Sequence, residues 1–301
     1  MIAVVSHDAG GAEILSSWLK RSKETYCLVL DGPAVGIFGR KIGNLQTHSL
    51  EVAIDMSDWV LCGTSWQSNL EKRAIIQAKA AGKKVIAFLD HWVNYLERFQ
   101  FEGHTVYPDE LWVGDVNAER IARKTFPSMK VCIYPNPYFA DIQIEIQSMS
   151  RDLRNSAECS ILYVCEPIRE HALVAYGNER YWGYTEEDAL RFFLENVALV
   201  GCAISEVTIR PHPSENKDKY VWAGQESSSV IETASTKTLM QQIIEADVVV
   251  GCESMAMVVA LLARKRVISS IPPGGKVCSL PQPAIEHLQK IVSKHQGIIG
   301  G

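Results

Sequence analysis

A histidine held between two prolines is the residue whose setting points most directly to chemistry. His212 lies between Pro211 and Pro213, directly after an apolar run that predicts a strand. The two prolines restrict the backbone, so the imidazole is held where the strand ends. Arg210 and Ser214 flank it, and all three side chains can donate hydrogen bonds to an anion. The loop therefore indicates a phosphate-binding site, although a surface turn with a solvated histidine explains it equally well.

A second motif follows about forty residues later in a strand, turn and helix pattern. Ser254 stands where the helix begins, and free backbone N–H groups and the helix dipole attract anions there. Glu253 precedes it and could accept hydrogen bonds from ribose hydroxyls. The loop at 272–276 adds backbone N–H groups and one lysine. The structural alternative is a serine that caps the helix beside an acidic residue that stabilises it.

The first loop of the chain offers candidates for proton transfer. Asp8 follows the first apolar run and precedes a helical pattern, so it is a candidate general base for an acceptor hydroxyl, with His7 as the alternative. Gly10 and Gly11 would allow a ligand to approach the backbone closely. The structural alternative is an Asp8 that caps the first helix.

Two more loops after predicted strands carry polar side chains. Thr64 and Ser65 offer hydroxyls suited to a sugar. Asp90 and His91 form a second candidate catalytic pair, or a pair that orients the acceptor. We expect the side chains of these loops to face the same ligand as His7, Gly10 and Gly11.

Three further features have less specific settings. Glu166 follows the first predicted strand of the second half and is a third candidate acid at the nucleotide-sugar site, or a structural residue beside a hinge. The aromatic cluster at 181–184 is more typical of hydrophobic packing than of a surface that binds sugar. Arg98 needs no role beyond that of a solvated side chain.

The elements that position these residues alternate between strand and helix over the whole chain. This alternation predicts two Rossmann-like α/β domains of GT-B-like architecture, each with a parallel sheet, over 1–150 and 151–301, with a polar linker at 139–157 and an interdomain cleft. Ligands of such sheets bind beyond the carboxyl ends of the strands. Strands are expected at 2–6, 26–30, 59–62, 85–89, 110–113, 130–134, 160–165, 207–210, 247–251 and 267–270. Helices are expected at 12–23, 70–81, 118–125, 185–199, 238–245, 255–264 and 283–295.

Composition and missing motifs narrow the classes of function. The 301 residues include 30 Lys and Arg against 35 Asp and Glu, so the net charge of −5 disfavours nucleic acid as a partner. The sequence lacks the Walker, dinucleotide-binding and nucleophile-elbow motifs. Its histidines are dispersed and its 8 cysteines form no CxxC pair, so we expect no metal, cofactor or disulfide framework. With no transmembrane segment and no signal peptide, a cytoplasmic protein is expected.

The two motifs of the second half resemble those of a known group of enzymes. The arrangement is similar to the nucleotide-sugar half of GT-B glycosyltransferases. More narrowly, Arg210–Pro213 followed by Gly251–Ser254 resembles the His-Pro and Ser motifs of bacterial sialyltransferases and Kdo transferases. This resemblance implies that His212 and Ser254 hold the phosphate of a CMP-sugar donor. The second motif has Glu253 where those families have Ser or Thr, which leaves the nucleotide open.

The sequence thus predicts a metal-independent glycosyltransferase that moves a sugar from a nucleotide donor to a carbohydrate acceptor. The resemblance implies a role in surface polysaccharide biosynthesis, with peripheral association with an assembly complex. A sugar-nucleotide epimerase or hydrolase of the UDP-GlcNAc 2-epimerase type would share the donor site. A non-catalytic sugar-nucleotide-binding protein is the third alternative, because 301 residues leave little room for acceptor loops.

Overall fold

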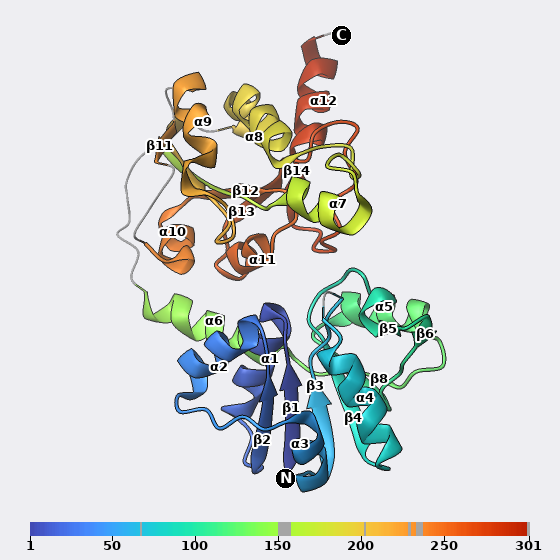
Figure 1. The fold of residues 1–301 in the computed structure, drawn as a ribbon. Helices are drawn as coiled ribbons and strands as arrows, with labels where there is room; N and C mark the ends of the chain where they lie inside the picture. The colour runs from blue at the N-terminus through green and yellow to red at the C-terminus, as the bar shows by residue number, and fades with distance from the viewer. Residues whose placement is uncertain (67, 150–157, 202, 228–229, 233–236, 300–301) are drawn as a thin grey trace. The chain divides into compact units, whose positions relative to one another are not determined.

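The chain forms two compact units, each built around its own sheet (Figure 1). The computed structural model describes residues 1–66, 68–149, 158–201, 203–227, 230–232 and 237–299. The units are Met1–Asp141 and Ile142–Gly301. The linker expected at 139–157 overlaps a helix, α6 (Pro137–Ser148), and its residues 150–157 lie outside the described part. The predicted α/β class with two parallel sheets is confirmed.

The sheet of the N-terminal unit is wholly parallel, with the order β2-β1-β3-β4-β7-β8. Its strands are short apolar runs, because helices cover both faces of a parallel sheet. The strand β2 pairs with one edge of β1. The strands β3, β4, β7 and β8 then extend the sheet in chain order from the other edge of β1. The strands are β1 (Ile2–Ser6), β2 (Tyr26–Leu30), β3 (Trp59–Cys62), β4 (Lys84–Leu89), β7 (Glu110–Val113) and β8 (Val131–Ile133).

Helices follow most of these strands and bury their apolar sides on the sheet. Leu15 and Phe38, for example, pack with Val4 and Phe88 in one core cluster. A separate two-stranded antiparallel sheet, β5 (Gln100–Phe101) with β6 (His104–Thr105), follows a short 3-10 helix at Glu97–Phe99. The helices are α1 (Ala9–Leu19), α2 (Pro33–Ile42), α3 (Leu50–Met56), α4 (Leu70–Ala80) and α5 (Val116–Thr125).

The sheet of the C-terminal unit is also parallel, with the order β11-β10-β9-β12-β13-β14. Its chain runs outward from β9 to β11 and then restarts on the other side at β12. The strands are β9 (Glu158–Val164), β10 (Ala203–Arg210), β11 (Val230–Glu232), β12 (Val248–Gly251), β13 (Arg266–Ser269) and β14 (Ile285–His287). The helices are α7 (Ile168–Tyr176), α8 (Glu186–Glu195), α9 (Val221–Glu226), α10 (Leu239–Glu245), α11 (Met255–Leu262) and α12 (Leu288–Ile299).

Local sequence explains where several of these helices begin. Thr185 and Asp188 form a capping box at the start of α8, and Thr238 and Gln241 form one at α10. In each box the two residues satisfy backbone N–H groups that the first turn leaves free. Gly82, at φ +70°, follows α4 in the left-handed conformation that suits glycine.

The structure corrects some predicted elements. The final helix expected at 283–295 is wrong at its start, because 285–287 pair with β13 as β14 and α12 begins at Leu288. An edge strand of three residues gives too short a pattern to be separated from a helix by periodicity. The helices α2, α3, α7 and α9 were not predicted either, and all have ten residues or fewer.

Two global expectations can be compared with the described residues. None of their helices is long and apolar enough to cross a membrane. Cys159 is disulfide-bonded, which the scattered spacing of the cysteines does not predict. The free cysteines among the described residues are Cys27, Cys62, Cys132, Cys165, Cys252 and Cys278.

Candidate functional site

The carboxyl ends of β1 and β3 are where the sheet topology of the N-terminal unit predicts a ligand to bind. These neighbouring strands lead to connections on opposite sides of the sheet, and ligands of open α/β sheets bind where the connections diverge. Gly11 and Gly63 pack backbone to backbone here, since a methyl group on Gly11 would lie 3.3 Å from the Gly63 Cα. At Gly11 the close neighbour is thus the chain itself, and the approach of a ligand to this glycine stays a prediction.

His7 and Asp8 form a side-chain pair at the end of β1. The His7 Nδ1 lies 2.7 Å from Oδ1 of Asp8, and both side chains remain about one-fifth exposed. Asp8 occupies the N-cap position of α1, but its side chain makes no capping hydrogen bond. The capping alternative is therefore not what this carboxylate does. It is oriented by the imidazole and accessible to a ligand.

Glu71, a residue the sequence did not single out, lies beneath this pair. Its Oε1 accepts the backbone N–H of His7 at 2.7 Å, and its side chain is almost completely buried. Burial raises the pKa of the Glu71 carboxyl to about 7, against an ordinary value of 4.5. With this pKa, the Glu71 carboxyl is partly protonated near neutral pH, and it lies beside Asp8, the candidate general base.

Asp90 is fixed by a buried ion pair with Arg98. The Arg98 Nη1 donates to Oδ1 of Asp90 at 2.6 Å and to Oγ1 of Thr64 at 2.9 Å. The side chains of Arg98 and Asp90 are 5% and 10% exposed. The interpretation of Arg98 as a solvated side chain is wrong. A guanidinium in direct contact keeps the carboxylate in place and leaves its Oδ2 for other partners.

Gly10 lies against that second oxygen, which makes it a sensitive position. A methyl group on Gly10 would lie 2.0 Å from Oδ2 of Asp90. We expect Gly10→Ala to lower the free energy of unfolding of the N-terminal unit by about 1–3 kcal/mol, because the carboxylate must move away from Arg98. Urea unfolding checks this value.

Gly36 supplies the matched control for Gly10. It also lies inside a helix, α2, but a methyl group there would meet nothing within 4 Å. Gly36→Ala should therefore raise the free energy of unfolding by about 0.5–1 kcal/mol, the usual gain of alanine over glycine in a helix. Equal stability of the two variants would contradict the close approach at Gly10.

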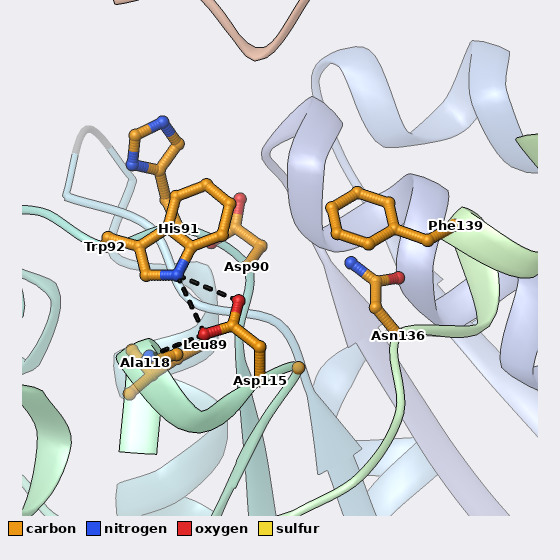
Figure 2. A pocket seen from close by; sticks show the side chains of 9 residues that line it. Leu89, Asp90, His91, Trp92, Asp115, Ala118, Asn136 and Phe139 are labelled. Atoms are coloured by element: carbon orange, nitrogen blue, oxygen red, sulfur yellow. Dashed lines mark hydrogen bonds between the residues drawn. The ribbon is translucent and has the colours of Figure 1, made fainter. Parts of the chain in front are cut away.

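A small pocket adjoins Asp90 at the carboxyl ends of β4 and β7 (Figure 2). Asp90 and His91 both line it, and the His91 ring lies 5.4 Å from the Trp92 ring. The Trp92 Nε1 donates to both carboxylate oxygens of Asp115, at 3.0 and 3.3 Å, and Asp115 caps α5. The loop that carries Asp90 and His91 is therefore anchored to a helix start, as a site that holds a ligand in a fixed geometry requires.

The remaining predicted residues of this unit lie close to Asp90 or support its loop. Thr64 donates towards Oδ1 of Asp90 at 3.4 Å, whereas the Oγ of Ser65 accepts the N–H of Ser68 at 2.8 Å and is buried. Thr64 thus belongs to the Asp90 cluster, and Ser65 stabilises the turn before α4.

In the C-terminal unit the same kind of divergence occurs between β9 and β12, and Glu166 occupies it. Its Oε1 accepts the backbone N–H groups of Glu253 and Cys252, at 2.8 and 3.2 Å. Burial raises the pKa of the Glu166 carboxyl to about 7, and the negative charge of Glu253 adds to the rise. The sequence predicts that the turn before α11 binds an anion. In the structure, the backbone N–H groups of this turn already donate to the carboxyl group of Glu166.

Short-range hydrogen bonds hold the loop that carries His212. Nδ1 of His212 accepts the N–H of Ser214 at 3.3 Å and lies 2.8 Å from its Oγ. A ring nitrogen that accepts a backbone N–H carries no hydrogen, so the hydrogen is on Nε2. Burial lowers the pKa of the imidazole below its usual 6.5. The loop thus offers a neutral Nε2–H donor.

Buried polar residues support this loop from below. Oε2 of Glu215 accepts the backbone N–H of His212 at 2.9 Å. Its Oε1 accepts from Lys219 at 2.8 Å and from the Tyr220 hydroxyl at 2.7 Å. The side chain of Glu215 is 2% exposed, so these contacts hold the position of the loop without facing a ligand.

Arg210 and Ser254 have structural partners. Nη1 of Arg210 donates to Oε1 of Gln242 at 2.5 Å and to the Lys237 carbonyl at 3.1 Å. The Oγ of Ser254 accepts the N–H of Ala256 at 3.2 Å and caps α11. Their phosphate-binding roles stay predictions, and Ser254 also performs the capping role that was its alternative.

Glu253 has partners that the sequence did not indicate. Its Oε2 accepts both the N–H and the Oγ–H of Ser279, at 3.0 and 2.9 Å, and its Oε1 is paired with Lys276. To bind the ribose as predicted, the Glu253 carboxylate would have to exchange its contacts with Ser279 and Lys276 for contacts with the ribose hydroxyls. Among the described residues, no group of three or more His, Cys, Asp or Glu side chains is placed to hold a metal ion.

Comparisons with known proteins concern the fold. No protein-family model and no curated protein matches the chain. The UDP-GlcNAc 2-epimerase from Neisseria meningitidis, solved bound to UDP-GlcNAc, is similar with a TM-score of 0.61 at 10% identity, over 99% of this chain and 91% of that one. The Methanocaldococcus jannaschii UDP-GlcNAc 2-epimerase, in complex with UDP-GlcNAc and UDP, gives 0.60 at 11% identity, over 99% and 92%. The chain thus has the GT-B-like fold of enzymes that act on sugar nucleotides.

Proposed function

We propose that the protein is an enzyme that acts on a sugar nucleotide, which its C-terminal unit binds at the carboxyl edge of its sheet. The observation that carries this proposal is the fixed imidazole of His212. The contacts with Ser214 and Glu215 leave its Nε2–H as a neutral donor at the end of β10, one strand from the divergence at β9. Such a donor suits a phosphate oxygen on a leaving nucleotide.

The N-terminal unit supplies the proposed proton acceptors. Asp90 is held in place by Arg98, and Asp8 is oriented by His7. A positioned carboxylate can take the proton of a hydroxyl as the new bond forms. His91 is the alternate, since it lines the pocket beside Asp90.

Two reactions fit these residues, and each has its own support. Glycosyl transfer, with a CMP-sugar as donor and a carbohydrate of a surface polysaccharide as acceptor, rests on the resemblance of the loops at 210–214 and 251–254 to those of sialyl- and Kdo-transferases. Epimerisation or hydrolysis of a UDP-sugar is supported by the fold, since the similar structures are UDP-GlcNAc 2-epimerases. A cytoplasmic enzyme is consistent with either reaction.

A binding experiment tests the shared part of the proposal. The purified protein is titrated with CMP, CDP, UDP, GDP and their sugar conjugates while its thermal unfolding is followed. A nucleotide present at about 100 times its Kd should stabilise the chain by roughly 2.7 kcal/mol. His212→Ala should weaken that nucleotide by about 10- to 100-fold, because it removes a hydrogen bond to a charged group.

His295→Ala is the control for this titration, since His295 is an exposed side chain on α12. This variant should bind as the wild-type chain does. No stabilisation by any nucleotide, or an equal response of His212→Ala, would overturn the proposal.

Product analysis then separates the two reactions. The sugar nucleotide that binds is incubated without an acceptor, and the mixture is followed by NMR. An epimer, or free nucleotide with a modified sugar, identifies the epimerase or hydrolase. Turnover that begins only when an oligosaccharide is added identifies the transferase. Asp8→Asn and Asp90→Asn should abolish either one, whereas a cellular activity that survives both would indicate a binding protein.

A further inference from the structure

The partners of Glu253 fix its carboxylate on both sides. Ser279 donates twice to one oxygen, at 3.0 Å from its N–H and at 2.9 Å from its hydroxyl. Lys276 forms an ion pair with the other oxygen, and the Glu253 side chain is 13% exposed. A carboxylate held in this way can orient a neighbour, and its own acceptor positions are largely occupied.

Lys276 is held by more than this ion pair. Its Nζ lies 4.4 Å from the centroid of the Trp182 ring, and its backbone N–H donates to the Trp182 carbonyl at 2.9 Å. Close backbone contact keeps the two loops together, since a methyl group on Gly183 would lie 2.3 Å from the Gly274 carbonyl oxygen. The lysine side chain nevertheless remains 30% exposed. An ammonium has three donor hydrogens, so one stays available to a ligand.

Apart from the His212 imidazole, two other sets of donors expected to bind phosphate at this edge of the sheet have partners within the chain. The guanidinium of Arg210 faces Gln242 and the Lys237 carbonyl. The N–H groups of Cys252 and Glu253 donate to Glu166. Lys276 also lies close enough to Glu166 to oppose the rise in its pKa. The ammonium of Lys276 is thus a positive charge at the divergence of β9 and β12.

From this arrangement we propose that Lys276 binds the phosphate of the nucleotide and that Glu253 positions Lys276 instead of binding the ribose. The inference rests on the proposed function and assigns its site a cation that recognises the anionic part of the ligand. An ammonium acts on phosphate as a compact point charge, so its attraction does not depend on the base or on the sugar. The ribose and base are then recognised by other groups.

Paired titrations of nucleotide and nucleoside test the role of Lys276. Lys276→Met removes the charge and keeps most of the aliphatic side chain. By calorimetry, its affinity for UDP or CMP, whichever the wild-type chain binds, should fall about 10- to 100-fold. Its affinity for uridine or cytidine should stay unchanged. Lys290→Met, at an exposed lysine on α12, should change neither affinity.

Salt gives a second readout with the same variant. The affinity of the wild-type chain for the nucleotide should fall with added NaCl more steeply than that of Lys276→Met, because a partly exposed charge pair is screened. An unchanged nucleotide affinity of Lys276→Met would overturn the inference while leaving the proposed function intact. Failure of the wild-type chain to bind any nucleotide would instead overturn the proposed function.

Glu253→Gln separates a positioning role from a ribose role. As a positioning residue, Glu253 restrains a flexible side chain, and its loss should weaken nucleotide binding about 3- to 10-fold in the wild-type background. In the Lys276→Met background the same substitution should not weaken it, since there is no ammonium left to position. Uridine or cytidine affinity should be unaffected in both. A loss of nucleoside affinity on Glu253→Gln would show the ribose role and overturn this assignment.

Discussion

Replacing Arg98 by methionine should lower the free energy of unfolding of the N-terminal unit by about 3–5 kcal/mol. The substitution keeps the bulk of the side chain but leaves Asp90 as a 10% exposed carboxylate without its cation. It also removes the donors to the Thr64 carbonyl at 3.1 Å and to the Val93 carbonyl at 3.2 Å. Urea unfolding followed by tryptophan fluorescence measures the effect. That signal reports mainly this unit, which contains Trp18, Trp59, Trp66, Trp92 and Trp112, five of the 7 tryptophans.

Two further variants show whether the buried charge is the cause. In the double variant with Asp90→Asn, most of the lost stability should return, because no unpaired carboxylate is left. Arg40→Met is the matched control, since Arg40 pairs with Glu13 at 2.6 Å but is 64% exposed. Its cost should be within about 1 kcal/mol. If Arg98→Met cost no more than Arg40→Met, the buried pair would not hold the Asp90 loop.

Glu71→Gln should be more stable than the wild-type chain above neutral pH. The difference in free energy of unfolding between the two chains should shift by about 3 kcal/mol in favour of the variant between pH 4.5 and the range above pH 7. Burial raises the pKa of Glu71 from 4.5 to about 7 in the folded chain. Below pH 4.5 both folded and unfolded chains hold the proton, so the wild-type chain loses nothing. Between pH 4.5 and about 7 the unfolded chain ionises while the folded chain keeps the proton, so the wild-type chain loses stability by about 1.4 kcal/mol for each pH unit, and above 7 the loss is complete. Glutamine does not ionise, and its carbonyl still accepts the His7 N–H.

Urea unfolding of the two chains across pH 4.5 to 8.5 measures this difference. Glu97→Gln serves as the control, because Glu97 is an exposed acid of the same unit. Its stability relative to the wild-type chain should stay flat over the range. A flat difference for Glu71→Gln as well would show that the Glu71 carboxyl titrates as it does in water.

The sequence predicts the architecture well because local patterns determine it. Buried parallel strands are short apolar runs, and each turn after a strand is marked by glycine, proline or a small polar residue. The strands at 2–6, 26–30 and 59–62 therefore agree with β1, β2 and β3 residue for residue. The loop at His212 is equally local, since its prolines and Ser214 lie within three residues of each other.

The partners within the site could not be predicted, because they depend on which strands are neighbours in the sheet. Glu71 meets His7 across 64 positions of the chain, and Glu166 meets Glu253 across 87. Even the contact of Arg98 with Asp90, 8 residues apart, requires the loop between them to fold back. No periodic pattern carries this information, so Glu71 had no sequence signal other than its place in the first turn of a helix.

The wholly parallel order of both main sheets bears on how the chain reaches its folded state. Parallel neighbours cannot be joined by a tight hairpin, so each pairing closes a long connection, and most of these connections contain a helix. The contact of Gly11 with Gly63 joins segments about 50 residues apart, and such non-local contacts slow folding. Asp8, Thr64 and Asp90 would then come together only as β1, β3 and β4 associate, late in the process. A nascent chain that has not yet completed β4 would carry Asp8 and Thr64 but would lack the assembled cluster of candidate proton acceptors.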